Sequence, residues 1–276
     1  MTHAAVAPTV LSLPTGDPHI RAEVDGAIGR LVVDNPERRN AVSLAMWTAI
    51  PGAVAALAGH PDVRVIVVRG AGDLAFVSGA DISEFATVRK DAACARAYEG
   101  ANAAAFAAVR RVEKPTVAMI RGFCLGGGMG LAAACDLRIA AADAVFGIPA
   151  ARLGVGYPPD CVADLVAAVG GQRAKELFFT ARRLHAAEAL AVGLVCAVHP
   201  VEAFENEAYD LAATIARNAP LTIRAAKAAV DAVVDGAGSA RRERLAALTD
   251  ACFASDDFAE GRTAFLEKRD PVFHGR

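Results

Sequence analysis

The 276-residue sequence predicts an α/β fold, and three features support this. A β-branched run at 63–69 and an apolar run at 116–120 have the length and composition of strands buried on both faces. Each run leads into a glycine-rich loop, and each loop leads into a helical segment rich in alanine or other apolar residues. This repeated order of strand, loop and helix is typical of a parallel sheet with helical crossovers.

The elements can be predicted in chain order. Residues 22–34 are expected to form two short strands around the Asp25-Gly26 turn. Ser43 is the predicted N-cap of a helix that extends toward Gly59, with a kink or break at Pro51. Further helices are expected over 91–112, 161–169, 173–179 and 186–192, and strands over 137–141 and 144–146.

The C-terminal part has a different character. From Val201 onward the pattern is helical, with breaks at Pro220 and near 236–238. We therefore expect three parts, namely a loose N-terminal tail over 1–18, an α/β core over 19–195 and a helical C-terminal region over 196–276.

Composition excludes several classes of protein. The net charge of −2 gives no basic excess for nucleic acid or an anionic membrane surface. No stretch has the length of a membrane span, and the N-terminus lacks a signal-peptide pattern. The six cysteines are scattered without a C-x-x-C pair, which favours reduced thiols over disulfides or a metal site. We expect a cytoplasmic protein without a bound metal.

The two glycine-rich loops, residues 75–82 and 122–130, follow strands and precede helices. Glycine allows close backbone approach to a ligand, and a helix N-terminus offers unpaired N–H groups. Two such groups pointing at one position would stabilise an oxyanion. The alternative is that both loops are tight turns that serve packing only.

Several motifs occur in a fixed order and decide between these alternatives. They are Asn35-Pro36 with Arg39-Asn40-Ala41, Phe76–Ile82 (FVSGADI), Lys114–Ala118 (KPTVA), Gly122 with Leu125–Gly128 (LGGG), Cys135–Ala140 (CDLRIA), Phe146–Pro149 (FGIP) and Ala186–Gly193 (AAEALAVG). With this set the chain resembles the enoyl-CoA hydratase/isomerase (crotonase) family over about residues 20–276.

The resemblance implies a fold and a ligand. The fold would be a spiral of β-β-α turns with a C-terminal helical region that supports a homotrimer or a dimer of trimers. The ligand would be an acyl-CoA thioester, with coenzyme A as part of the substrate and no separate cofactor. By the same resemblance, the backbone amides of Ala80 and Gly127 would hold the thioester oxygen and stabilise its enolate.

The resemblance also implies contacts to the substrate. These map onto Arg38, Ala41, Ile82, Gly128, Tyr157 and Lys268, the last of which would reach the CoA phosphates of a neighbouring subunit. For Arg38 and Lys268 the alternative is a solvated surface charge, and for Tyr157 it is a packing role.

The chain departs from the family at the two catalytic glutamates, whose positions are held by Gly130 and Ala150. Water addition to an enoyl thioester uses paired acid/base groups, and neither residue can transfer a proton. Asp160 and Glu84 are candidate replacements, although Asp160 could instead cap the helix that starts near Cys161.

Two functions remain open from the sequence. The first is an enzyme that acts on a CoA thioester through the oxyanion hole, as an atypical hydratase, an isomerase, a decarboxylase or a thioesterase. The second is a non-catalytic acyl-CoA binding protein that keeps the same hole as a ligand anchor.

Overall fold

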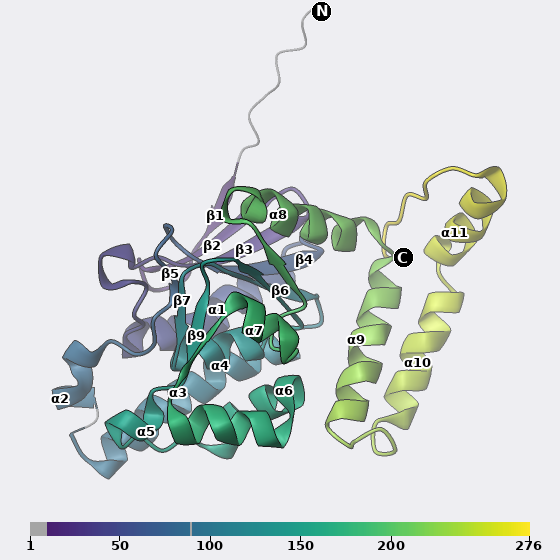
Figure 1. The fold of residues 1–276 in the computed structure, drawn as a ribbon. Helices are drawn as coiled ribbons and strands as arrows, with labels where there is room; N and C mark the ends of the chain where they lie inside the picture. Colours follow the sequence, from purple (N-terminus) through teal and green to yellow (C-terminus); the bar gives the residue numbers. More distant parts are fainter. Residues whose placement is uncertain (1–9, 89) are drawn as a thin grey trace, which may run out of the picture.

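The computed structural model describes residues 10–88 and 90–276 and shows an α/β fold with two sheets (Figure 1). In the larger sheet β1 to β3 pair antiparallel, and β3, β4, β6, β8 and β11 pair parallel. Its order is β1 (Leu11–Leu13), β2 (Ile20–Asp25), β3 (Ile28–Val33), β4 (Val65–Gly70), β6 (Thr116–Ile120), β8 (Leu137–Ala141) and β11 (Ala197–His199).

The smaller sheet has the order β10 (Arg183–His185), β9 (Val145–Gly147), β7 (Phe123–Leu125) and β5 (Ala75–Val77). Here β5, β7 and β9 are parallel, and β10 is antiparallel to β9. The pairs β4–β5, β6–β7 and β8–β9 each give one strand to each sheet, and a helix follows each pair. The expected spiral of β-β-α turns is therefore confirmed.

The helices are interspersed with the strands and fill the C-terminal part. They are α1 (Leu44–Gly59), α2 (Phe85–Val88), α3 (Ala92–Arg111), α4 (Gly127–Ala133), α5 (Ala150–Leu153), α6 (Pro159–Thr180), α7 (Ala186–Ala191), α8 (Val201–Arg217), α9 (Pro220–Val234), α10 (Arg242–Phe253) and α11 (Asp256–Glu267), with 3₁₀ turns η1 (Pro36–Arg38) and η2 (Ile82–Glu84).

Side-chain caps fix the starts of α1 and α3. The Ser43 hydroxyl accepts a hydrogen bond from the Met46 amide, as predicted, and the Asp91 carboxylate accepts from the amides of Ala93 and Cys94. The helix does not break at Pro51, and α1 continues past it to Gly59. In contrast, Gly170 interrupts α6 with non-helical backbone angles (φ 74°, ψ 160°), so the two helices predicted there lie on either side of it.

Two apolar clusters hold the layers together. The larger one packs α1, α3 and α4 against both sheets and includes Trp47, Phe106 and Phe146, all almost fully buried. The smaller one packs α8 on the other face of the large sheet, where Phe204 meets side chains of β4 and β6. The large sheet is thus covered on both faces, as its continuous apolar strands predict.

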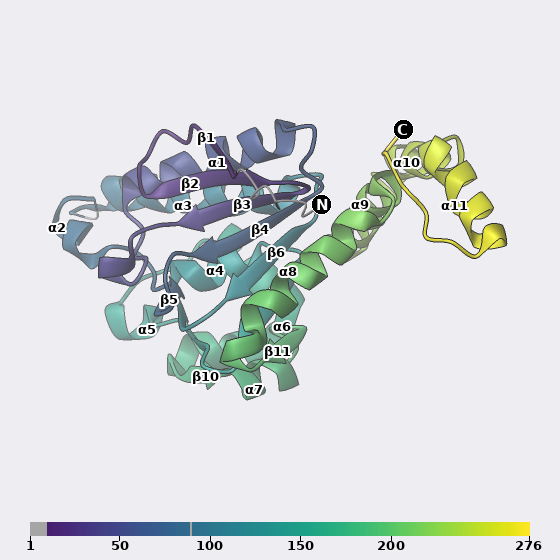
Figure 2. The ribbon, with the colours of Figure 1, turned by 90° about the horizontal axis from the view of Figure 1, so that it is seen from above.

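Helices α9 to α11 form an arm that projects away from this body (Figures 1 and 2). Basic side chains tie the arm to the body, among them Lys227 and Arg64. Lys227 of α9 forms an ion pair with Asp136 at 2.8 Å, and Arg64 donates to the Phe273 carbonyl at 2.7 Å. None of the helices formed by described residues is long and apolar enough to span a membrane.

The structure corrects three expectations about boundaries. Residues 11–13 are strand β1, paired with β2, rather than loose tail, while residues 1–9 of the expected tail lie outside the described residues. Strand β11 pairs with β8, so the α/β core continues past residue 195. The glycine-rich loop expected over 75–82 begins with β5, and the loop expected over 122–130 contains β7.

Candidate active site

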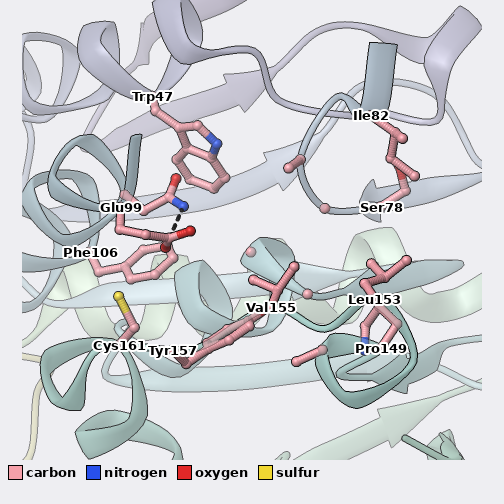
Figure 3. A pocket seen from close by; sticks show the side chains of 16 residues that line it. Trp47, Ser78, Ile82, Glu99, Phe106, Pro149, Leu153, Val155, Tyr157 and Cys161 are labelled. Carbon is pink, nitrogen blue, oxygen red and sulfur yellow. Dashed lines mark hydrogen bonds between the residues drawn. The ribbon is translucent and has the colours of Figure 1, made fainter. Parts of the chain in front are cut away.

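The two glycine-rich loops meet at a pocket of about 80 Å³ on the side of the smaller sheet (Figure 3). At its outer end Ile82 and Leu153 are 66% and 52% exposed. At its inner end Trp47, Phe106 and Cys161 are at most 6% exposed. The pocket therefore opens between Ile82 and Leu153 and ends at the aromatic side chains.

The backbone around Ala80 is held by residues on both sides of it. The Val42 amide donates to the Gly79 carbonyl, and the Asp81 amide donates to the Val42 carbonyl. Because successive amides of an extended chain point to opposite sides, the Ala80 N–H points away from Val42. Tyr98 strengthens this support, since its hydroxyl donates to the Val42 carbonyl and accepts from the Trp47 indole.

The second amide belongs to Gly127, the first residue of α4. The first amides of a helix have no intrahelical acceptor, so Gly127 N–H is available to a ligand and carries the positive end of the helix dipole. The preceding residue, Gly126, has φ 54° and ψ −115°, a conformation open to glycine, and this turn aims α4 at the pocket. A Cβ built on Gly79 would lie 4.0 Å from the Gly127 nitrogen, so the two loops are in contact.

Trp47 explains why position 127 is a glycine. A Cβ at Gly127 would lie 2.8 Å from a carbon of the indole ring, closer than van der Waals contact allows. Gly128 faces the other way, and a Cβ there would lie 2.2 Å from the Val77 carbonyl oxygen. Gly128 therefore has a packing role against β5 and does not line the pocket, which corrects its predicted substrate contact.

An aromatic ring fills the space beside Gly130. A Cβ there would lie 2.5 Å from two ring carbons of Phe106, and this ring packs edge-on against Trp47. A glutamate at position 130 therefore has no room unless Phe106 moves. The second glutamate position, Ala150, is the first residue of α5 and lines the pocket without any acid/base group.

The two predicted replacement acids lie elsewhere. Asp160 is exposed in the first turn of α6 and does not line the pocket, so the structure does not support its predicted acid/base role. Nor does its side chain cap α6, whose N-cap is Pro158. Glu84 accepts a hydrogen bond from the Leu44 amide at 3.0 Å and is occupied at the N-terminus of α1 rather than in the pocket.

The carboxylate in the pocket is Glu99, which the sequence did not reveal. It lies on α3 at the inner end, between Trp47 and Phe106 (Figure 3), and Asn102 lies beside it on the same helix. The Asn102 amide donates to Glu99 Oε2 at 3.4 Å. The sequence feature that could have identified Glu99 is its helical spacing from two neighbours. Glu99, Asn102 and Phe106 lie three and four residues apart, on one face of an alanine-rich helix.

The mouth of the pocket carries the predicted contacts of the first loop. Ile82 lines it, whereas Ala41 does not. The Arg38 guanidinium donates to Asp81 and to the Ser83 hydroxyl, each at 2.7 Å. Burial acts to raise the pKa of Asp81, but hydrogen bonds from Ser83 and Arg38 outweigh it and hold that pKa below its usual range. Arg38 is thus an exposed cation beside the entrance.

The remaining predicted residues divide between the pocket and the arm. Tyr157 lines the pocket and packs edge-on against Phe178 of α6. Lys268 ends α11 in the left-handed conformation (φ 54°) and lies in the arm, across the molecule from α5 (Figures 1 and 2). A contact of Lys268 with a neighbouring subunit's ligand stays a prediction.

Thiol and metal chemistry are poorly supported at this site. Burial and the nearby carboxylates of Glu99 and Asp160 raise the pKa of Cys161 to about 11, so the thiol is protonated at neutral pH. Within residues 10–88 and 90–276, no three His, Cys, Asp or Glu side chains gather as a metal-binding group.

The comparison with protein families agrees with this geometry. The enoyl-CoA hydratase/isomerase family model matches residues 23–276. The chain belongs to the enoyl-CoA hydratase/isomerase family. The resemblance drawn from the loop motifs is thereby confirmed, and residues of three of these motifs, at 78–80 and 82, at 126–127 and at 149, line the pocket.

Individual family members cover nearly the whole chain. A crotonyl-CoA hydratase of Syntrophomonas wolfei is 35% identical over 258 residues, which are 92% of this chain and 97% of the relative. A short-chain-enoyl-CoA hydratase of Clostridium acetobutylicum is 32% identical and covers 90% of this chain and 94% of its own. The crystal structure of an enoyl-CoA hydratase/carnithine racemase from Magnetospirillum magneticum superposes with a TM-score of 0.88 at 34% identity, covering 94% of this chain and 97% of that one.

Proposed function

We propose that this protein is an enzyme that binds acyl-CoA thioesters, forms their enolate between the amides of Ala80 and Gly127, and moves a carbon–carbon double bond. The supporting observation is that both amides border a pocket in which positions 130 and 150 carry no carboxylate. Enolate stabilisation needs the amides, whereas water addition by the paired mechanism needs two acid/base groups.

The chemistry of the lining separates the other reactions considered. Glu99 is the charged side chain among the described residues that line the pocket, and no Lys, Arg or His joins it there. A malonyl-type substrate would bring its free carboxylate beside that of Glu99, and the repulsion between like charges disfavours the binding that decarboxylation requires. A protonated Cys161 disfavours thioester cleavage through a thiolate. Movement of a double bond needs one proton-transfer group and no second reactant.

The test is a panel of saturated, 2-enoyl, 3-enoyl and malonyl-type CoA thioesters, each incubated with the protein in D2O and followed by mass spectrometry and ultraviolet absorbance. We expect conversion of the 3-enoyl thioester to the conjugated 2-enoyl isomer, at unchanged mass apart from deuterium. Gain of water, loss of CO2 or release of free CoA as the main change would contradict the proposal. Tight binding without any change would establish the alternative, a non-catalytic acyl-CoA binding protein.

A further inference from the structure

The inner end of the pocket holds a polar pair within an apolar wall. Glu99 and Asn102 lie between Trp47, Phe106 and Cys161, and a 3.4 Å hydrogen bond joins the Asn102 amide to Glu99 Oε2 (Figure 3). Asn102 is 6% exposed. Glu99 is half-buried, and alanine occupies many of the neighbouring positions of α3. A polar group as buried as the Asn102 amide is costly unless it is hydrogen-bonded.

Asn102 has one buried polar atom without a partner. Its carbonyl oxygen, Oδ1, makes no hydrogen bond with the part of the chain that the structure describes. Buried acceptors without a partner are rare in folded proteins, and each calls for an explanation. Here the acceptor stands next to a group that can gain a proton. An ionised carboxylate accepts hydrogen bonds, whereas a protonated carboxylic acid can also donate one. The Asn102 amide can serve both states, because its nitrogen donates and its oxygen accepts.

We propose that Glu99 is the single proton-transfer group of this pocket and that Asn102 positions it in both of its protonation states. The inference rests on the proposed function. Ala80, Gly127 and Glu99 line the same pocket. The proposed substrate is a 3-enoyl-CoA thioester whose oxygen is held by the two amides while its carbon C2 faces Glu99.

The reaction balances without any other reactant. Glu99 takes a proton from C2, the C2–H electrons form the C1–C2 double bond of a dienolate, and the negative charge rests on the thioester oxygen between the two amides. The protonated Glu99 then returns its proton to C4. The new C4–H bond forms from the C3–C4 double bond, the enolate collapses to the thioester, and a C2–C3 double bond remains. The net change is migration of one double bond.

In this proposal, the hydrogen bond between Asn102 and Glu99 changes direction when Glu99 gains its proton. While Glu99 is ionised, Asn102 Nδ2 donates to it, as the structure shows. Once Glu99 carries the proton, rotation of the amide brings Oδ1 to accept from the acid. An asparagine is suited to this task because its amide carries a donor for the carboxylate and an acceptor for the carboxylic acid.

The decisive experiment compares carboxylate-to-amide variants with the substrate used in the panel. Glu99→Gln is expected to lower the rate of 3-enoyl to 2-enoyl conversion about 10²- to 10⁴-fold, the usual contribution of a general acid/base. Its affinity for a saturated acyl-CoA, measured by calorimetry, should stay within about threefold of wild type. Glu84→Gln and Asp160→Asn are the matched controls and should keep the wild-type rate, because both side chains lie outside the pocket.

The positioning role of Asn102 is tested by a measurement that the loss of a mere packing contact would not change. Asn102→Ala should shift the pH dependence of kcat while the acyl-CoA affinity stays close to wild type, because it removes the group that balances the two states of Glu99. Asn102→Gln should not restore the profile, since its longer side chain places the amide differently.

The outcomes separate the two proposals. An active wild type with a fully active Glu99→Gln overturns the assignment of Glu99 and leaves the proposed function standing. A wild type without any conversion overturns both. Loss of conversion in Glu84→Gln or Asp160→Asn, with binding retained, would transfer the role to that residue and also overturn the assignment.

Discussion

Gly127 contributes an amide to the pocket and also makes room for the indole of Trp47. Gly127→Ala should therefore turn the start of α4 away from the pocket and lower turnover of acyl-CoA by about 10²- to 10³-fold, the loss measured for one oxyanion donor. Steady-state kinetics measure this. Gly52→Ala is the matched control, because Gly52 lies inside α1 with open space around it, and there alanine should raise stability by about 0.5–1 kcal/mol without affecting kcat.

Phe106 and Gly130 should behave as one unit. Gly130→Ala forces a methyl group against the Phe106 ring and should destabilise the fold by about 1–3 kcal/mol. In the double variant with Phe106→Leu, the clash is relieved, and the loss should be smaller than the sum of the two single losses. Denaturant unfolding measures all three variants. An additive result would show that the ring moves aside freely, and Gly100→Ala, in open space on α3, is the control.

Among the elements, α11 is fastened to the C-terminal tail by a carboxylate. Glu260 accepts hydrogen bonds from the Arg269 guanidinium and from the Val272 amide, which lower its pKa to about 2. Because the pKa of the folded state lies below that of the unfolded chain, this contribution is present above about pH 5 and is lost as the pH falls toward 2.

Glu260→Gln should accordingly speed amide hydrogen exchange over residues 269–274 at pH 7. The difference from wild type should shrink steadily as the pH falls below 4, because the wild-type carboxyl then loses its charge. Glu243→Gln, an exposed glutamate in the first turn of α10, should leave this segment unchanged at either pH. A constant difference across the pH range would show that the charge of Glu260 is not what fastens the tail.

At the same scale, sequence prediction succeeded where local signals decide the structure. Strands β4 and β6 were predicted from continuous apolar runs, and Ser43 from its place before a helical pattern. Strands β5 and β7 were missed because each is only three residues long and lies inside a glycine-rich stretch. Their pairing depends on partners distant along the chain, which local propensity does not indicate.

The site was predicted in part for the same reason. The positions of backbone amides follow the fold, so the family resemblance implied Ala80 and Gly127, and both residues line the pocket. Whether an acid/base side chain reaches the pocket depends on which face of its helix is turned toward the pocket. Glu84 and Asp160 lie close to the loop motifs in sequence yet point elsewhere, while Glu99 comes from the middle of α3.

For the whole molecule, the arm of α9 to α11 exposes more apolar surface than an isolated chain favours. Val233, Phe253 and Phe265 are 77%, 64% and 83% exposed. We expect the arm to be covered in a homotrimer or a dimer of trimers. Sedimentation velocity should show such an assembly, and Val233→Glu with Phe265→Glu should dissociate it. Leu74→Glu, equally exposed on the body, should not. A wild-type monomer at micromolar concentration would contradict this expectation.

The aromatic wall beside Gly130 has a consequence for the lifetime of the proton taken from the substrate. A bound water needs several polar partners, and the Phe106 ring beside Gly130 offers none. We therefore expect no water on this side of the pocket to take the proton from Glu99, which favours its return to the molecule from which it came. With a substrate deuterated at C2, we expect part of the deuterium to appear at C4 of the product. The product of one turnover would then retain label from its own substrate molecule.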